Sequence, residues 1–343
     1  MLLFSVFVII KAHTDMKFID TKTDSIYFGI LVAVLAVLYF FVASPVFFWG
    51  KAKEPAKNEK VNIEQLREHV TSLTSLSPTR TFPNATLEDS AKYIAQYFQS
   101  YCDEVSLQKY VVASTTVENI VCSIGISKPG RIVIGAHYDT FGPTPGADDN
   151  ASGVAGLLEL ARIIAGNEKK FTERVDLVAF TLEEPPYFRT ENMGSFQYAL
   201  SLKKENVPVK IMVSLETIGY FSEKKDSQHF PHWLLKAMYP NTGNYILIIG
   251  DIKQSLLTRE FKKHFKDGAN ISAWSLNGPT NLFGLDFSDH RSFWGFGYPA
   301  IMVTDTAIYR NQNYHEKTDT AETLNYEKMA EVVEGVYSGI KGL

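Results

Sequence analysis

The sequence predicts an α/β fold: a three-layer α/β/α domain with a mostly parallel central sheet, preceded by one transmembrane helix. Short apolar runs alternate with helical patterns along most of the chain, which is typical of a sheet covered by helices on both faces. The runs are almost wholly apolar, as strands buried on both faces are. A third observation, an uncharged stretch near the N-terminus, predicts the membrane helix.

Residues 28–49, FGILVAVLAVLYFFVASPVFFW, contain no charged residue. As a helix at about 1.5 Å per residue they would extend about 33 Å, enough to cross the hydrocarbon core of a bilayer. Aromatic residues near both ends, with Lys51 and Lys53 directly beyond, are typical of the membrane interface. A cleaved signal peptide would have a shorter apolar stretch. We therefore predict a transmembrane helix over residues 27–49, through which the chain contacts the membrane.

The chain is predicted to have three further segments. An N-terminal segment, residues 1–26, precedes the helix, and its start is open because Met16 is an alternative first residue. A polar linker, residues 50–61, joins the helix to one domain over residues 62–343. The basic residues beside the helix would keep this domain in the cytoplasm, but long domains cross membranes with little regard to such charges. Charge therefore leaves the orientation open.

The composition indicates a globular chain, because 45% of its 343 residues are hydrophobic and 21% are charged. The net charge is −4 without a cluster of Lys and Arg, so we expect no nucleic acid partner. Cys102 and Cys122 cannot form a disulfide scaffold or a C-x-x-C site. Whether these two cysteines form one disulfide stays open. Two unpaired thiols in separate strands are favoured, because a disulfide needs a particular Cα geometry.

The domain is expected to begin with two amphipathic helices. Asn62 caps the first, with Gln65 at the third helical position and Leu66 on the apolar face. The second opens at Thr86, where Thr86 and Asp89 form a T-x-x-D capping pattern. Further helical patterns lie at residues 151–165, 253–266 and 325–340.

Apolar runs bounded by turn residues predict the strands of the sheet. The run RIVIGA, residues 131–136, indicates a central strand because it is almost wholly apolar. The predicted strands lie at residues 105–112, 118–125, 131–136, 175–180, 210–216, 245–250 and 299–305.

Acidic residues and histidines follow these strands, at the edge where open α/β sheets gather their functional residues. His137 and Asp139 follow the central strand, and Glu183 and Glu184 follow the next apolar run. Other strands and the loop GPTPGADDNASG add Asp148, Asp149, Glu216, Asp305 and, ten residues later, His315.

Each of these residues alone has an ordinary explanation, such as a helix cap or a solvated loop side chain. Together, two imidazoles and three carboxylates at one edge of a sheet form a mixed nitrogen and oxygen set that suits Zn²⁺. So many carboxylates would repel one another without cations, and a pair of metal ions removes that repulsion. The predicted metal ligands, for two zinc ions, are His137, Asp149, Glu184, Glu216 and His315.

Five motifs occur in order: AHYDT, GADDNASG, TLEE, SLETIGY, and SDHRSFW followed by NYHEKTDT. With them, the chain from about residue 62 onward resembles the M28 zinc peptidases, a family of co-catalytic aminopeptidases with glutamate carboxypeptidase and glutaminyl cyclase relatives. A lone H-x-D or EE motif is a weak signal, but five motifs in order are specific. The resemblance implies that His137 and Glu216 bind one metal ion, that Glu184 and His315 bind the other, and that Asp149 bridges both.

The resemblance also implies which neighbouring residues take part in catalysis. Glu183 would act as the general base toward the attacking water and then protonate the leaving amine. Asp139 would hold the second ring nitrogen of His137, as outer carboxylates commonly do for metal-bound histidines. Lesser candidates are Asp289, as a further outer contact, and, from their position just before His315 alone, Tyr309 or Arg310 as donors of a hydrogen bond to the developing oxyanion; for Tyr309 a packed aromatic is the alternative.

Two features depart from the common family pattern. Glu216 stands where many members have Asp, which adds a methylene but keeps a carboxylate that can bind zinc. The acidic pair is followed by PPYFRTENMGS, a longer loop than usual. Pro185 and Pro186 stiffen this loop, and its Tyr187, Phe188 and Arg189 are expected to shape substrate access.

The favoured function is a zinc-dependent aminopeptidase that acts on peptides. The alternatives are an acyltransferase of the glutaminyl cyclase kind, with one zinc, and a non-catalytic membrane receptor or scaffold of the same fold. The intact ligand set and Glu183 favour an enzyme. The resemblance also implies a single-pass membrane protein with its catalytic domain outside the cytoplasm. Side-chain specificity, carboxypeptidase or dipeptidase action, and oligomeric state stay open.

Overall fold

The computed structural model describes residues 21–42, 61–75, 79–282 and 284–343. The chain divides into two units, Met1–Phe41 and Val42–Leu343. The described part of the first unit is helix α2 (Thr21–Val42) except for its last residue. This helix overlaps the predicted transmembrane helix, and residues 43–49 of that prediction lie outside the described residues. Most of the predicted N-terminal segment and linker lie outside them too. Among the described residues, no helix combines the length and hydrophobicity needed to cross a membrane.

The second unit is built on one sheet of eight strands in the order β1-β2-β4-β3-β5-β8-β6-β7. Its centre, β4-β3-β5-β8, is parallel, as predicted. The sheet is mixed because β2 is antiparallel to β1 and to β4, and β6 is antiparallel to β8. The strands are β1 (Glu104–Val112), β2 (Thr115–Ile124), β3 (Arg131–His137), β4 (Arg174–Phe180), β5 (Val209–Glu216), β6 (Tyr245–Asp251), β7 (Ser272–Gly278) and β8 (Ala300–Thr304).

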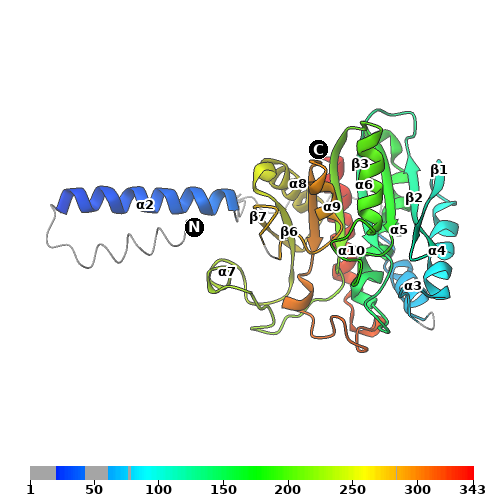
Figure 1. Cartoon of the computed structure of the whole chain (residues 1–343). Coiled ribbons are helices and arrows are strands. Elements are labelled where there is room, and N and C mark those ends of the chain that lie inside the picture. The colour runs from blue at the N-terminus through cyan, green and yellow to red at the C-terminus, as the bar shows by residue number, and fades with distance from the viewer. Residues whose placement is uncertain (1–20, 43–60, 76–78, 283) are drawn as a thin grey trace. The chain divides into compact units, whose positions relative to one another are not determined.

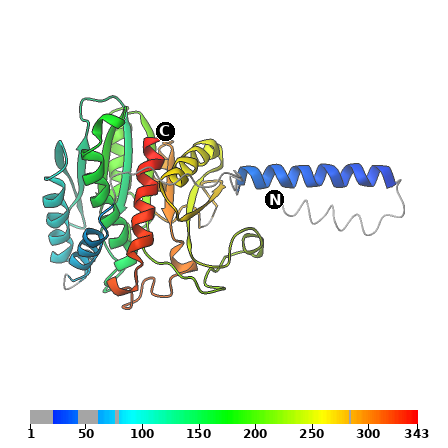
Figure 2. The same cartoon turned by 180° about the vertical axis from the view of Figure 1, so that it is seen from behind.

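Helices cover both faces of the sheet, which confirms the predicted three layers. Figure 1 shows α6 on one face, and Figure 2, from behind, shows α10 on the other. The α10 face carries α3 (Ile63–Thr74), α4 (Ala85–Phe98), α5 (Gly153–Ala165), α8 (Ser255–Gly268) and α10 (Tyr326–Lys341). The α6 face carries α6 (Gly194–Lys204) and α9 (His290–Gly295), and the short α7 (Trp233–Met238) lies in the connection from β5 to β6.

Helix α5 is the centre of the larger core. Its sequence, GVAGLLELARIIA, is apolar almost all round, and most of it is buried between the central strands and helices α3 and α10. This packing fixes the segment before α5, a kinked turn over Ala147–Ser152 in which the predicted ligand Asp149 and its neighbour Asn150 have non-helical backbone angles. The core therefore holds one side of the candidate site in place.

The predicted start and cap of the second amphipathic helix are wrong. The second amphipathic helix begins at Ala85, and its cap is Asn84, whose side chain accepts a hydrogen bond from the backbone N–H of Thr86. The Thr86 hydroxyl instead donates to the carbonyl of Thr79, at 2.6 Å. The first helix does start as predicted, because Asn62 accepts from the backbone N–H groups of Glu64 and Gln65.

The two cysteines form a disulfide, so the prediction of unpaired thiols in separate strands is wrong. Cys102 lies between α4 and β1, whereas Cys122 is in β2. The antiparallel pairing of β1 with β2 places Glu104 opposite Ser123 and Val105 opposite Cys122. This register brings the two Cα atoms to 5.5 Å, a normal separation for a disulfide.

Candidate metal centre

The five predicted metal ligands meet at the carboxyl edge of the parallel strands. His137 ends β3 and Glu216 ends β5, while Glu184 follows β4. The other two come from loops, Asp149 from the turn before α5 and His315 from the segment after β8. Two groups of potential ligand atoms, each within 4.8 Å of one another, share Asp149: one adds His137 and Glu216, the other Glu184 and His315.

Asp149 lies between two imidazoles. Its Oδ1 is 3.2 Å from Nε2 of His137, which is also 3.4 Å from Oε2 of Glu216. Its Oδ2 is 3.1 Å from Nε2 of His315, which is 3.4 Å from Oε2 of Glu184. The two oxygens of one carboxylate thus face two separate pairs of nitrogen and oxygen donors.

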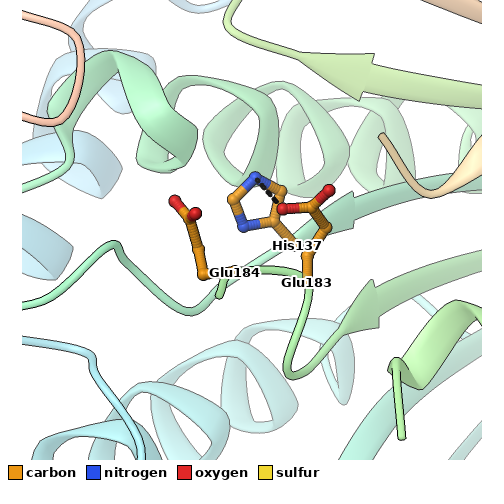
Figure 3. Close-up of side chains that lie close together, drawn as sticks. All are labelled: His137, Glu183 and Glu184. Atoms are coloured by element: carbon orange, nitrogen blue, oxygen red, sulfur yellow. Dashed lines mark ion pairs between the residues drawn. The ribbon is translucent and has the colours of Figure 1, made fainter. Parts of the chain in front are cut away.

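Glu183 lies beside this set. Its Oε2 is 4.0 Å from Nε2 of His137, farther than the oxygens of Asp149 and Glu216. Figure 3 shows the side chains of Glu183 and Glu184 on opposite sides of the His137 ring. The carboxylate of Glu183 is therefore close enough to act on a molecule held in the site.

The buried carboxyl groups of the site resist ionisation, because burial leaves a charged carboxylate poorly solvated. Burial, with the nearby charge of Asp149, raises the pKa of Glu184 to about 8. Burial also raises the pKa of Glu183 well above its usual range and raises that of Glu216. Burial acts on Asp149 as well, but the close imidazoles of His137 and His315 outweigh it and hold the pKa of Asp149 below its usual value.

The two imidazoles respond to these carboxylates. Burial acts to lower the pKa of His137, but the charge of Glu216 and close contacts with Asp139 and Asp149 raise it well above its usual value. Burial likewise opposes protonation of His315, but the close carboxylates of Asp149 and Glu184 raise its pKa to about 10. The site therefore favours positive charge between these side chains, whether protons or metal ions supply it.

Four potential ligand atoms of the site are buried and, among the described residues, have no hydrogen-bond partner of normal geometry: Nε2 of His137, Nε2 of His315, Oδ2 of Asp149 and Oε1 of Glu184. Unpartnered buried polar atoms are rare in proteins, and each needs an explanation. Metal ions would satisfy all four. The mixture of imidazole and carboxylate donors fits zinc.

Asp139 supports both sides of the site, although not quite as predicted. Its carbonyl oxygen, 3.2 Å from Nδ1 of His137, is the nearer partner of that ring, and its Oδ1 is 3.6 Å away. The Asp139 carboxylate instead accepts the backbone N–H groups of Glu183 and Glu184, at 3.1 and 3.0 Å. It thereby fixes the turn that presents both glutamates.

The loop of Asp149 is held by residues that sequence reasoning missed. The carboxylate of Asp319 accepts the backbone N–H groups of Asp148 and Asp149, at 2.9 and 3.1 Å. Gly146 precedes them with a φ of +58°, and a Cβ there would lie 2.3 Å from the carbonyl oxygen of Asp149, so a side chain would not fit. Asp319 lies within the motif NYHEKTDT, which was the available signal.

Arg80 was also missed, and it connects the central strand to the same loop. The side chain is fully buried. Its Nε donates to the carbonyl of Tyr138, and its other nitrogens donate to the carbonyls of Leu73, Pro145 and Gly146, at 2.8 to 3.0 Å. Carbonyl acceptors leave no trace in a sequence, so no motif indicates this role.

Two further contacts act on the ligands directly. The hydroxyl of Ser288 donates to Oε2 of Glu216, at 2.7 Å, which orients this longer carboxylate. The ring of His315 stacks with Phe141 and Tyr314, at 4.1 and 3.9 Å between centroids. Burial, together with the charges of Asp149 and other site carboxylates, raises the pKa of Tyr314 well above its usual value. Its hydroxyl therefore keeps its proton within electrostatic reach of the site.

The three lesser candidates are placed differently from one another. Asp289 is fully buried, and burial raises its pKa to about 7 while the charge of His137 lowers it, so Asp289 lies near the site. Arg310 is buried elsewhere, where Nε donates to Gln228 at 2.9 Å and the guanidinium lies 4.9 Å from the ring centre of Tyr245. The carbonyl of Tyr309 accepts from the backbone N–H of His229. These contacts do not bring Tyr309 or Arg310 together with the five ligands.

Two curated relatives resemble the chain over most of its length. The protein YfbL of Escherichia coli (strain K12) is 40% identical, over 90% of this chain and 97% of its own. A probable leucine aminopeptidase of Arthroderma otae is 27% identical, over 78% of this chain and 69% of its own.

Solved structures share the fold. The LapA aminopeptidase of Legionella pneumophila aligns with a TM-score of 0.65 at 22% identity, over 82% of this chain and 72% of its own. A glutaminyl cyclase of Bacteroides thetaiotaomicron aligns with a TM-score of 0.62 at 15% identity, over 84% of this chain and all of its own. The model of Peptidase family M28 matches residues 119–339, which include all five predicted ligands. The chain therefore belongs to peptidase family M28.

Proposed function

We propose that this chain is a zinc-dependent aminopeptidase that binds two metal ions and releases N-terminal residues from peptides. The observation that carries the proposal is the position of Asp149, whose two oxygens face His137 and His315 at 3.2 and 3.1 Å. One ion would be held by His137, Glu216 and Asp149, and the second by His315, Glu184 and Asp149. When bound, two zinc ions supply Lewis-acid polarisation of the scissile carbonyl and activation of water.

Glu183 is the proposed general base. It lies beside His137, with its backbone N–H bonded to the carboxylate of Asp139. Its buried setting raises its pKa well above the usual range, which suits a carboxylate that must hold a proton between two steps. Glu183 takes a proton from the attacking water and gives it to the amine that leaves.

Tyr314 is the proposed donor to the oxygen that becomes negative during attack, in place of the predicted Tyr309 or Arg310. Its ring is stacked on His315, which limits its movement. Its raised pKa keeps the hydroxyl protonated. A positioned neutral donor of this kind stabilises an oxyanion more than it stabilises the neutral carbonyl.

The aminopeptidase relative, at 27% identity, supports this activity, whereas the glutaminyl cyclase structure supports only a shared fold. Two imidazoles on either side of Asp149 favour two ions over the single zinc of a cyclase-like acyltransferase. A receptor or scaffold without activity would not need Glu183 beside the donor set.

We also propose that the chain crosses a membrane once and that its catalytic domain lies outside the cytoplasm. The support is the uncharged sequence of residues 28–49 and the disulfide between Cys102 and Cys122, since disulfides persist in oxidising compartments. A reporter enzyme fused to the C-terminus tests this location. Reporter activity confined to the cytoplasm would refute it.

Hydrolysis of a leucyl anilide by the purified full chain tests the proposed activity. We expect turnover that a chelator abolishes and that added zinc restores. Turnover that persists in chelator would reject a metal-dependent mechanism. Cyclisation of an N-terminal glutamine without anilide hydrolysis would favour the acyltransferase.

A further inference from the structure

The long loop after Glu184 is fixed at both ends. The backbone N–H groups of Tyr187 and Phe188 both donate to the carbonyl of Glu184, at 3.0 and 3.3 Å. At the far end, the hydroxyl of Tyr110 donates to the carbonyl of Asn192, at 2.8 Å. The loop therefore presents its middle residues from a defined position beside the metal centre.

A second loop meets the first one. The rings of Phe188 and Phe287 contact edge to face, with centroids 6.1 Å apart and planes at 82°. Phe287 directly precedes Ser288, whose hydroxyl bonds Glu216. One loop thus starts at a predicted ligand of one metal ion, and the other contacts a predicted ligand of the second ion. Their meeting point is connected to Glu184 through three intervening residues and to Ser288 directly.

Two guanidinium groups share one carboxylate at this meeting point. A terminal nitrogen of Arg189 is 2.6 Å from Oδ1 of Asp286, and Nε of Arg291 is 3.5 Å from Oδ2. Arg189 also lies 5.3 Å from the centres of the Phe188 and Phe287 rings, which hold it by cation–π contact. Asp286 can neutralise only one of the two arginines.

Donors remain available on both arginines. The Arg189 side chain is 38% exposed, whereas that of Asp286 is 13% exposed. The Arg291 side chain is 26% exposed. A guanidinium carries five N–H donors in a planar fork, and this fork matches a carboxylate. The cluster of Arg189, Asp286 and Arg291 therefore has an excess positive charge and unused donors for an anion.

We propose that this arginine cluster binds a carboxylate of the peptide substrate, on the leaving-group side of the scissile bond. The inference rests on the proposed peptidase function and narrows its substrates. The carboxylate is either the C-terminal one of a dipeptide or an acidic side chain. If the cluster served only to join the two loops, the loss of Arg189 would affect the hydrolysis of charged and neutral peptides equally.

The test compares substrates that differ in whether, and where, they carry a carboxylate. The full chain with zinc is assayed with leucylglycine, with leucylglycinamide, and with leucylglutamic acid α-amide, whose only carboxylate is on the glutamyl side chain. In the Arg189→Gln variant, kcat/KM for a carboxylate substrate should fall about three- to tenfold relative to leucylglycinamide, mainly through KM. A fall in kcat/KM for leucylglycine identifies the C-terminal carboxylate as the group that the cluster binds. A fall in kcat/KM for the glutamyl peptide identifies the side-chain carboxylate.

A matched control uses Arg67→Gln on α3. Arg67 is another partly exposed arginine, 48% exposed and 4.0 Å from Glu64, and its replacement should leave all substrate ratios unchanged. Equal losses for the three substrates in Arg189→Gln, or no loss at all, would overturn the inference. Leucyl anilide hydrolysis by the unchanged chain reports the proposed function separately.

Binding without turnover gives a second measurement. Calorimetry of the Glu183→Gln chain with leucylglycine and leucylglycinamide reports affinity when hydrolysis is blocked. Adding Arg189→Gln should weaken the binding of leucylglycine about three- to tenfold more than the binding of leucylglycinamide. Equal effects on both ligands would reject the carboxylate site even if the anilide is hydrolysed.

Discussion

Oδ1 of Asp149 lies 3.2 Å from Nε2 of His137, and Oδ2 of the same carboxylate lies 3.1 Å from Nε2 of His315. This relationship requires a strand end, a buried turn and a distant C-terminal loop to meet. Asp319 holds the turn by accepting two of its backbone N–H groups. The arrangement is the basis for proposing two metal ions that share one bridging carboxylate.

Replacement of Glu183 by Gln should abolish turnover and preserve metal binding. An amide cannot accept the proton of the attacking water, so kcat should fall about 10²- to 10⁴-fold. Steady-state hydrolysis of a leucyl anilide measures the loss, and elemental analysis measures the metal. Glu191→Gln, on the exposed part of the following loop, is the control. Activity within a few fold of normal would remove Glu183 from this role.

Replacement of Tyr314 by Phe should lower kcat and leave KM nearly unchanged. Loss of one hydrogen bond to a developing oxyanion costs about 2 to 3 kcal/mol, or about 30- to 200-fold in rate. Tyr309→Phe is the matched comparison, because the sequence alone pointed to that hydroxyl. A large loss in Tyr309→Phe with a normal rate in Tyr314→Phe would contradict the assignment.

Arg80→Met should destabilise the domain and weaken metal binding together. The variant leaves four carbonyls, of Leu73, Tyr138, Pro145 and Gly146, without their buried donor. Unsatisfied buried groups cost about 1 to 3 kcal/mol each, so the free energy of unfolding should fall by at least about 3 kcal/mol. Urea unfolding and zinc titration measure the two effects. Unchanged values in both would show that Arg80 does not hold the loop.

His69 should make the stability of the domain fall in mild acid. Burial lowers its pKa to about 4, with the charge of Glu159 opposing this shift. The pKa of His69 in the folded protein lies below the usual 6.5. The contribution of neutral His69 to the free energy of unfolding is therefore complete above pH 6.5 and is lost as the pH falls toward 4. Between pH 7 and pH 5 this amounts to about 2 kcal/mol.

Urea unfolding at both pH values measures the contribution of His69. The His69→Phe variant loses the hydrogen bond with Tyr93, but its stability should depend less on pH by about 2 kcal/mol. The comparison within each protein removes the constant cost of the substitution. An equal pH dependence in both proteins would show that His69 is not held neutral.

The disulfide between Cys102 and Cys122 should stabilise the folded domain. It spans 20 residues of sequence, and closing such a loop in the unfolded chain contributes about 3 kcal/mol. The double variant Cys102→Ala/Cys122→Ala should lose about this much in urea unfolding. Two titratable thiols in the unreduced protein would show instead that the bond does not form.

Uniform apolar runs made most of the sheet predictable. β3 (Arg131–His137) reads RIVIGAH, and such a segment can be buried only as a central strand or helix. β7, SAWSLNG, was missed because its small and polar residues lack that signal. Its place at the edge of the sheet depends on pairing with β6 and packing under α8. These contacts are not encoded in the segment itself.

The residues of the site also divide into those that the sequence could predict and those that it could not. Ligand candidates carry chemistry that is visible in the sequence, so His137 and Glu184 could be selected before the fold was known. Arg80 and Ser288 could not, because their partners, backbone carbonyls and a distant glutamate, are set by tertiary structure. The register of the β1–β2 hairpin likewise decided the pairing of Cys102 and Cys122, which spacing alone could not.

The zinc content of the purified full chain, measured by elemental analysis after removal of loosely bound metal, tests the central claim most directly. The proposed site predicts about two zinc ions per chain, and about none in Asp149→Ala, because both ions share this carboxylate. One ion per chain that survives loss of Asp149, or none in a folded and zinc-supplemented protein, would contradict the two-metal peptidase.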